Sequence, residues 1–216
     1  MLALSGCIVT IDAMGCQKEI ANKIIDKGAD YVLALKGNQS NLHKDVRRLF
    51  DFALDIGFVD YDYHKTVDKK SHGRHEIRHC WTISDPASLG NVRNVSAWQK
   101  LQTIVMVKSE RTSGKKTTTE SRYFISSLAG DAQQTLAAVR EHWHIENQLH
   151  WILDVAFAED SCRVRKENGP QNFAVLRHIA MNLLTQEDTA KCGIQAKRKK
   201  AGWDNNYMLK VLSGFT

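Results

Sequence analysis

The 216-residue sequence is 43% hydrophobic and 25% charged, which is ordinary for a globular protein with a substantial core. Its formal net charge of +6 and pI near 9.1 are compatible with a polyanionic partner without requiring one, and leave ribosomal, nuclease and membrane-surface proteins open. No run of 18 or more apolar residues occurs, which excludes a membrane span, and the length predicts one domain with an insertion or two small domains.

The cysteines are odd in number, widely spaced and free of any C-x-x-C pair. This pattern predicts reduced thiols in a cytoplasmic protein and argues against a zinc ribbon or a disulfide framework. Leu4-Ser5-Gly6-Cys7 has the form of a bacterial lipoprotein cleavage site, but only six residues precede the cysteine and none is basic. We therefore interpret this segment as the approach to a buried strand.

The first elements form a β-α-β unit. Residues 6–12 are a β-branched apolar run that ends in Asp12, residues 16–27 have helical apolar spacing, and residues 31–36 are a second apolar run. This order predicts a parallel strand pair, and in such sheets sites form beyond the carboxyl ends of the strands. Asp12 is placed there. A helix N-cap or a turn residue is an equally good interpretation of Asp12 in isolation.

After a helix at residues 39–56, the pattern changes to period two. Residues 58–128 therefore predict a strand-rich insertion, with a strand at 74–84 and a hairpin formed by 101–110 and 117–126. The insertion carries cations that are candidates for contact with a phosphate backbone. Basic side chains on strands also commonly serve only to solvate a face. The candidates are Arg74, Arg78, Lys108, Arg111, Lys115 and Lys116.

Residues 137–160 predict a helix with an acidic residue on its apolar face. At 3.6 residues per turn, Glu146 falls among Val139, Trp143, Leu149 and Leu153, with His142 one turn before it and His150 one turn after it. A carboxylate there needs a cation, a metal or strong donors. An ion pair at the edge of the core and a catalytic metal ligand both satisfy that need. A zinc triad with the two histidines is excluded, because i, i+4 and i+8 span about 12 Å on a straight helix.

The carboxyl-terminal part has one further apolar helix, at residues 171–186. Residues 187–216 are thinly apolar, and we expect a basic tail whose run Lys197–Lys200 is solvated or contacts nucleic acid. The sequence contains neither a P-loop nor a dinucleotide fingerprint. It therefore predicts no organic cofactor.

Six segments together resemble one family. They are IVTIDAMGCQKEIA (8–21), DYVLALKGNQ (30–39), KSHGRHEIR (70–78), RYFISSL (122–128), HWHIENQLHWILDVAFAEDSCRVR (142–165) and RHIAMNLLT (177–185). On these segments the chain resembles the DDE-class insertion-sequence transposases, most closely the H-repeat-associated family of bacteria. The likeness covers nearly the whole chain, and the 142–165 segment is its most specific part.

The resemblance implies an α/β fold of the ribonuclease H type, a mixed sheet with flanking helices and a strand-rich insertion. It implies DNA as the partner, and DNA cleavage and strand transfer with two Mg²⁺ or Mn²⁺ ions held by two Asp and one Glu. Asp12 matches the second Asp and Glu146 the Glu, so their carboxylates are expected within roughly 9 Å of each other. Related families have an Arg one turn before the Glu and a basic residue after it. Here His142 and His150 stand there, as candidate DNA contacts.

The amino end departs from the family pattern, because residues 1–11 contain no Asp or Glu that could be the first catalytic Asp. We therefore expect residues 1–186 to form an amino-terminally incomplete catalytic domain, with 187–216 as the tail, and to be inactive alone. A non-catalytic DNA-binding remnant that regulates a full-length transposase is the first alternative, and a fold fragment without a partner is the second. A homo-oligomer stays open, and no membrane association is expected.

Overall fold

A computed structural model describes residues 3–58, 61–70 and 74–215, with only the backbone described at positions 69, 70, 74, 146, 147 and 215. The chain divides into an amino-terminal unit, Met1–His142, and a carboxyl-terminal unit, Trp143–Thr216. Among the described residues, no helix is both long and apolar enough to cross a membrane.

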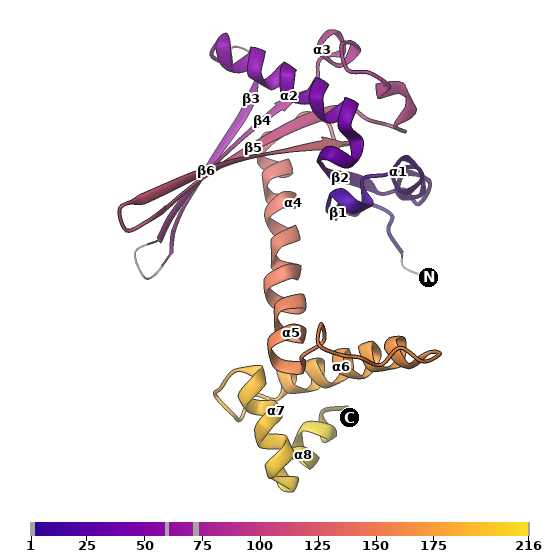
Figure 1. Ribbon diagram of the computed structural model, residues 1–216, viewed down its shortest axis with the longest axis vertical. Coiled ribbons are helices and arrows are strands. Elements are labelled where there is room, and N and C mark those ends of the chain that lie inside the picture. Colours follow the sequence, from indigo (N-terminus) through magenta and orange to yellow (C-terminus); the bar gives the residue numbers. More distant parts are fainter. Residues whose placement is uncertain (1–2, 59–60, 71–73, 216) are drawn as a thin grey trace. The chain divides into compact units, whose positions relative to one another are not determined.

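The amino-terminal unit is built on one six-stranded mixed sheet in the order β1-β2-β6-β5-β4-β3 (Figure 1). β1 and β2 are parallel, as the β-α-β pattern predicts, and all other neighbours are antiparallel. The strands are β1 (Ile8–Ile11), β2 (Asp30–Leu35), β3 (Asp62–Lys70), β4 (Arg74–Ile83), β5 (Thr103–Ser113) and β6 (Lys116–Ser126).

The strand-rich segment 58–128 does not form a separate sheet. β6 pairs directly with β2, so β3–β6 continue the sheet begun by the β-α-β unit. The β5–β6 hairpin is confirmed, with its turn after Ser113. Figure 1 shows the β5–β6 hairpin extending beyond the helices, and in β6 the six residues from Lys116 to Ser121 are exposed. The first half of β6 is therefore open to solvent.

Helices cover the other half of the sheet on both faces. On one face, α1 (Lys18–Asp26) and α2 (Ser40–Asp55) contribute Ile24, Val46 and Phe50 to a core that includes Leu33 and Ile104. On the other face, α4 (Ala132–Ile145) contributes four buried residues to a smaller core, Ala132 among them. It places Leu136, Ala138 and Val139 over Val32, Cys80, Val105 and Phe124. The short helix α3 (Pro86–Gly90) lies between β4 and β5 in sequence.

The predicted continuous α-helix at 137–160 is wrong in one respect. α4 ends at Ile145, a π-helical turn follows at Glu146–His150, and α5 occupies Trp151–Phe157. A π turn holds an extra residue, so side chains after it point in other directions than a 3.6-residue period predicts. The predicted apolar stripe is also interrupted before the turn, since Trp143 of α4 is 43% exposed while Val139 and Leu153 are buried.

The described elements of the carboxyl-terminal unit are all helices. α6 (Gly169–Gln186) confirms the predicted helix, and α7 (Ile194–Trp203) and α8 (Asn205–Leu212) follow it. Leu183 and Leu184 of α6 form a small core with Tyr207 and Val211 of α8. The region expected to be a tail is thus folded against α6.

Lys197 does not belong to a solvated basic run, because its side chain is buried. The ammonium group donates hydrogen bonds to the backbone oxygens of Leu184, at 2.9 Å, and Glu187. The Glu187 carboxylate accepts a hydrogen bond from the Tyr207 hydroxyl at 2.7 Å and others from Thr189. These hydrogen bonds lower the pKa of Glu187 to about 2, with the Thr189 bond as the largest cause.

Candidate active site

Asp12 lies where the sequence places it, directly after β1. Its backbone is extended and begins a 3₁₀ turn at Ala13–Gly15. The turn folds closely back on the strand, because a Cβ at Gly15 would lie 2.4 Å from Cγ2 of Ile11. A residue larger than glycine would therefore displace this turn, and the carboxylate of Asp12 with it.

Lys36 occupies the equivalent position after β2 and faces Asp12. Because β1 and β2 are parallel, their carboxyl ends lie together, and Lys36 Nζ is 3.5 Å from Asp12 Oδ1. Both side chains are exposed. The pKa of the Asp12 carboxyl is lowered, mainly by a hydrogen bond from the backbone of Ala13 and further by the charges of Lys36 and His142. Asp12 is therefore an ionised carboxylate with the ammonium of Lys36 beside it.

Two side chains from the turn after β2 hold the Asp12 turn in place. Asn38 Nδ2 donates to the Ala13 carbonyl oxygen at 2.5 Å, and Gln39 Nε2 donates to the Cys16 carbonyl oxygen at 3.0 Å. These polar residues directly follow the buried strand β2. Asp12 follows β1, which is a partly exposed edge strand and not the buried strand that the sequence predicted. The strand-end position that marks Asp12 as a candidate marks Lys36, Asn38 and Gln39 in the same way.

The structure brings one histidine of the predicted helix to this edge. His142 of α4 lies with Nδ1 3.2 Å from the hydroxyl oxygen of Thr10 on β1. Thr10 and Asp12 are two residues apart and therefore point to the same face of the sheet. His142 is thus placed beside Asp12 by contacts within the amino-terminal unit.

Glu146 belongs to the carboxyl-terminal unit. Its backbone begins the π turn, and its side chain lies outside the described residues. The distance from Asp12 to Glu146 stays a prediction, because the two residues are in different units. His150 ends the π turn and is exposed.

The candidate DNA contacts of the hairpin region fall into two groups. Lys115 and Lys116 lie at the exposed β5–β6 turn. Arg78 is 17% exposed and pairs instead with Asp68 and Glu76, the latter at 2.7 Å. The side chain of Arg74 is outside the described residues.

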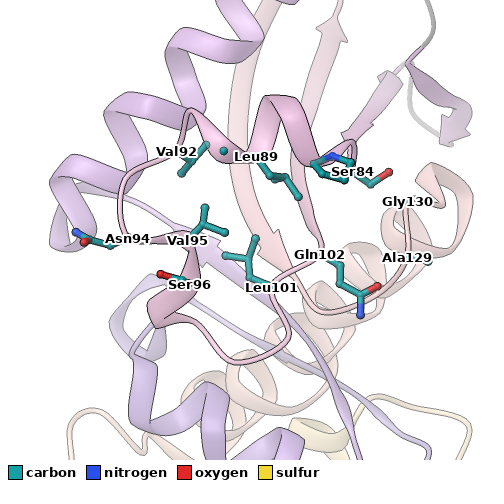
Figure 2. Close-up of a pocket in the computed structure, with 12 residues that line it drawn as sticks. Ser84, Leu89, Val92, Asn94, Val95, Ser96, Leu101, Gln102, Ala129 and Gly130 are labelled. Carbon is teal, nitrogen blue, oxygen red and sulfur yellow. The ribbon is translucent and has the colours of Figure 1, made fainter.

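A second feature, a pocket of about 710 Å³, is separate from this edge (Figure 2). Its floor includes Leu89, Val92 and Leu101, and its lining contains no charged residue. The pocket lies near the carboxyl end of β6, which runs antiparallel to β2 and so ends far from the carboxyl end of β2. It therefore offers no acid, base or nucleophile to the Asp12 site.

Comparison with known proteins decides the family. A model of the transposase DDE domain matches residues 1–183. The chain belongs to the DDE transposase family. This chain is 39% identical over 218 residues to the H repeat-associated putative transposase YhhI of Escherichia coli strain K12. It is 36% identical over 224 residues to the putative transposase YncI of Escherichia coli O157:H7.

These alignments cover 99% of the transposase-family chain, but only 57% of YhhI and 54% of YncI. The chain thus spans little more than half the length of the curated relatives it matches. The resemblance seen in the sequence is confirmed at the level of the family.

The DDE transposase family generally uses divalent metals, so the residues present can be compared with such a site. Mg²⁺ and Mn²⁺ prefer several carboxylate oxygens. The described part of the chain contains no group of three or more His, Cys, Asp or Glu side chains that could hold a metal. The carboxylate of Asp12 faces the ammonium of Lys36 instead. The described residues alone therefore do not fit a two-metal centre.

Proposed function

We propose that this chain is a DNA-binding part of a DDE transposase whose complete form cleaves DNA and transfers strands. The observation that carries the proposal is the position of Asp12, at the carboxyl edge of two parallel strands in a chain matched by the DDE domain model. In this proposal the sheet is the carboxyl-side portion of a ribonuclease H-like fold. Asp12 and Glu146 are two of its three metal-binding carboxylates.

In the complete family, two bound metals would activate the attacking oxygen and stabilise the leaving oxygen of the phosphodiester. Asp12 would contribute an oxygen ligand that is already ionised, since its pKa is lowered. Lys36 and His142 would supply positive charge to a phosphate at the same edge, with His142 doing so only when protonated. Asn38 and Gln39 would fix the turn that carries Asp12.

We further propose that the chain does not catalyse transposition by itself. Residues 1–11 contain no acid, so the third carboxylate has no counterpart there. The ion pair between Lys36 and Asp12 favours the alternative function. In that function the chain is a non-catalytic DNA-binding protein that acts on a full-length transposase. In both functions the partner is DNA, and the expected location is the cytoplasm.

DNA contact is assigned to the exposed hairpin region rather than to Arg78. Lys115 and Lys116 sit at a turn that extends beyond the helices, where a phosphate backbone has access (Figure 1). Lysines bind phosphates as point charges without base specificity. Binding is therefore expected to depend on salt and to show little sequence preference.

The test measures binding of the purified chain to a labelled DNA duplex by fluorescence anisotropy, between roughly 50 and 200 mM salt. Affinity should fall linearly on a double-logarithmic plot. Replacing Lys115 and Lys116 by Ala should reduce the slope by about 2. The control replaces Lys23 and Lys44, two exposed helix lysines, by Ala and should leave the slope unchanged. A salt-independent affinity, or no binding at low salt, would exclude the proposal.

Catalysis is tested separately by nicking of supercoiled DNA with Mn²⁺, using the intact chain and its Glu146→Ala and Asp12→Ala variants. No nicking above the variants' background is expected. Nicking that both substitutions abolish would show that the chain holds a complete active site, and would refute the proposed inactivity while leaving DNA binding intact.

A further inference from the structure

Arg140 lies on the last turn of α4 within the amino-terminal unit, and we propose that it is a positioning residue for the Asp12 site. The same turn carries His142, whose ring meets Thr10 beside Asp12. Glu146 follows directly after the end of α4. The inference rests on the proposed function, because the position of this turn matters to the chemistry only if Asp12 and its neighbours form the site.

The core packing of α4 stops before the helix ends. Its buried residues lie between Ala132 and Val139, whereas residues 140–145 are all half-buried or exposed. A helix end that lacks apolar contacts frays readily, and polar contacts then decide how far it opens. The position of His142 therefore depends on side-chain contacts of the turn that carries it.

Arg140 supplies such a contact by reaching from α4 to Asp68 of β3. Its Nη2 atom lies 3.1 Å from Oδ1 and 3.0 Å from Oδ2 of the Asp68 carboxylate. The two side chains are 39% and 21% exposed, so water reaches the pair only in part. Hydrogen bonds between two charged groups are about twice as strong as those between neutral groups.

Asp68 is a suitable anchor for this contact. Its strand is paired with β4 along its length, and Arg78 of β4 donates a hydrogen bond to the same carboxylate. Burial acts to raise the pKa of the Asp68 carboxyl, but Arg78 and Arg140 outweigh burial and the pKa is lowered. Arg140 therefore binds an ionised group that is fixed to the sheet.

Arg140 and His142 hold the turn from opposite sides. Two positions on a helix with 3.6 residues per turn are about 200° apart. Arg140 contacts β3 and His142 contacts β1, which are the last and the first strands in the order of the sheet. The turn cannot move toward either strand without lengthening its contact with the other. Loss of the Arg140 contact should therefore disturb the contact between His142 and Thr10.

NMR spectroscopy of the full chain, without DNA or metal, tests this with the Arg140→Met variant. The nuclear Overhauser effect between the Thr10 methyl group and the His142 ring reports their contact, and amide hydrogen exchange reports the opening of residues 141–144. We expect the Overhauser effect to weaken. Exchange should become about two- to fivefold faster, which is the factor that loss of a largely solvated ion pair implies.

The matched control is Arg111→Met, which removes an arginine from the same group of charges. Arg111 pairs with Glu76, at 3.2 Å, and belongs to β5. This variant should leave both the Overhauser effect and the exchange of residues 141–144 unchanged. A role of Arg140 confined to balancing charge in the sheet predicts instead that the two variants behave alike.

The melting temperature of Arg140→Met should fall by no more than about 3 °C, because the pair is partly exposed. If circular dichroism shows that this variant is unfolded, Arg140→Gln, which keeps a polar side chain without the charge, decides the matter. Unfolding of both variants would overturn the proposal, since it would assign Arg140 a role in stability alone.

An Arg140→Met protein with an unchanged Overhauser effect and unchanged exchange would also overturn the proposal, as would equal changes in Arg111→Met. Since no DNA is present, the result is independent of the anisotropy test of DNA binding. A chain that responds as expected but binds no DNA would lose the proposed function, while the contact between Arg140 and Asp68 would still be shown to hold the turn.

Discussion

Replacing Arg78 by Ala should destabilise the amino-terminal unit rather than remove a DNA contact. The guanidinium of Arg78 pairs with both Asp68 and Glu76, and the three side chains are only 17%, 21% and 9% exposed. Among the described side chains, the substitution would leave Glu76 paired with Arg111, at 3.2 Å. Asp68 would keep its pair with Arg140, at 3.0 Å.

The magnitude follows from the partial burial of these pairs. Exposed ion pairs contribute up to about 1 kcal/mol, whereas breaking a buried pair costs about 3–5 kcal/mol. Arg78 lies between these limits, so we expect the free energy of unfolding to fall by about 2 kcal/mol. For a unit of this size the melting temperature would then fall by about 6 °C.

Thermal unfolding and DNA anisotropy on the same samples separate the two roles. Lys116→Ala is the matched control, since it removes one positive charge from an exposed strand end. It should keep the melting temperature and weaken DNA binding, while Arg78→Ala should do the reverse. An Arg78→Ala protein of unchanged stability that has lost as much DNA affinity as Lys116→Ala would refute this reasoning.

Three further outcomes are expected. The Asp45 carboxyl has a lowered pKa, because Arg93 donates hydrogen bonds to it. Its stabilising contribution is therefore present above about pH 4 and is lost as the pH falls through the lowered pKa. Urea unfolding across acidic pH should show this loss, and the Asp45→Asn variant should show less of it. Tyr207→Phe removes a donor to Glu187 and should raise the pKa of that carboxyl above about 2, as measured by NMR titration; an unchanged pKa would contradict the assigned contact. Lys197→Met should lower the free energy of unfolding by about 1–3 kcal/mol in urea, whereas Lys199→Met, which changes an exposed lysine, should not.

Local sequence patterns were sufficient for most of the fold. The β-branched run before Asp12 and the apolar run 31–36 predicted two strands that the structure pairs in parallel. Alternation in 101–126 predicted the β5–β6 hairpin, because side-chain direction in a strand depends only on the residue's own position. These signals are local, and so they can be read without knowing the tertiary contacts.

The π turn and the folded carboxyl end were missed because their causes are not local. Apolar spacing does not encode where a helix takes an extra residue, so one continuous helix was expected over residues 137–160. Lys197 reads as part of a charged run, but its partners are backbone oxygens of Leu184 and Glu187. Such contacts are visible only once α7 lies against α6.

The same distinction applies to the candidate site. Asp12 was predicted from its place at a strand end, which the structure confirms. Its pairing with Lys36 and its proximity to His142 join positions far apart in sequence, and no spacing rule predicts them. The role of Glu146 as the second metal-binding carboxylate stays a proposal.

Asn38 and Gln39 donate hydrogen bonds to the turn after β1, so the mobility of Asp12 depends on the loop after β2 as well as on its own turn. A surface turn of this length would ordinarily open on its own and exchange its amide protons quickly. Here the turn can open only if the loop after β2 releases it, so slow exchange should extend from the strand into residues 15 and 16. Substitution of Asn38 or Gln39 would then first reduce the order of the backbone around Asp12, although the hydrogen bonds of both residues go to backbone oxygens and not to the Asp12 carboxylate.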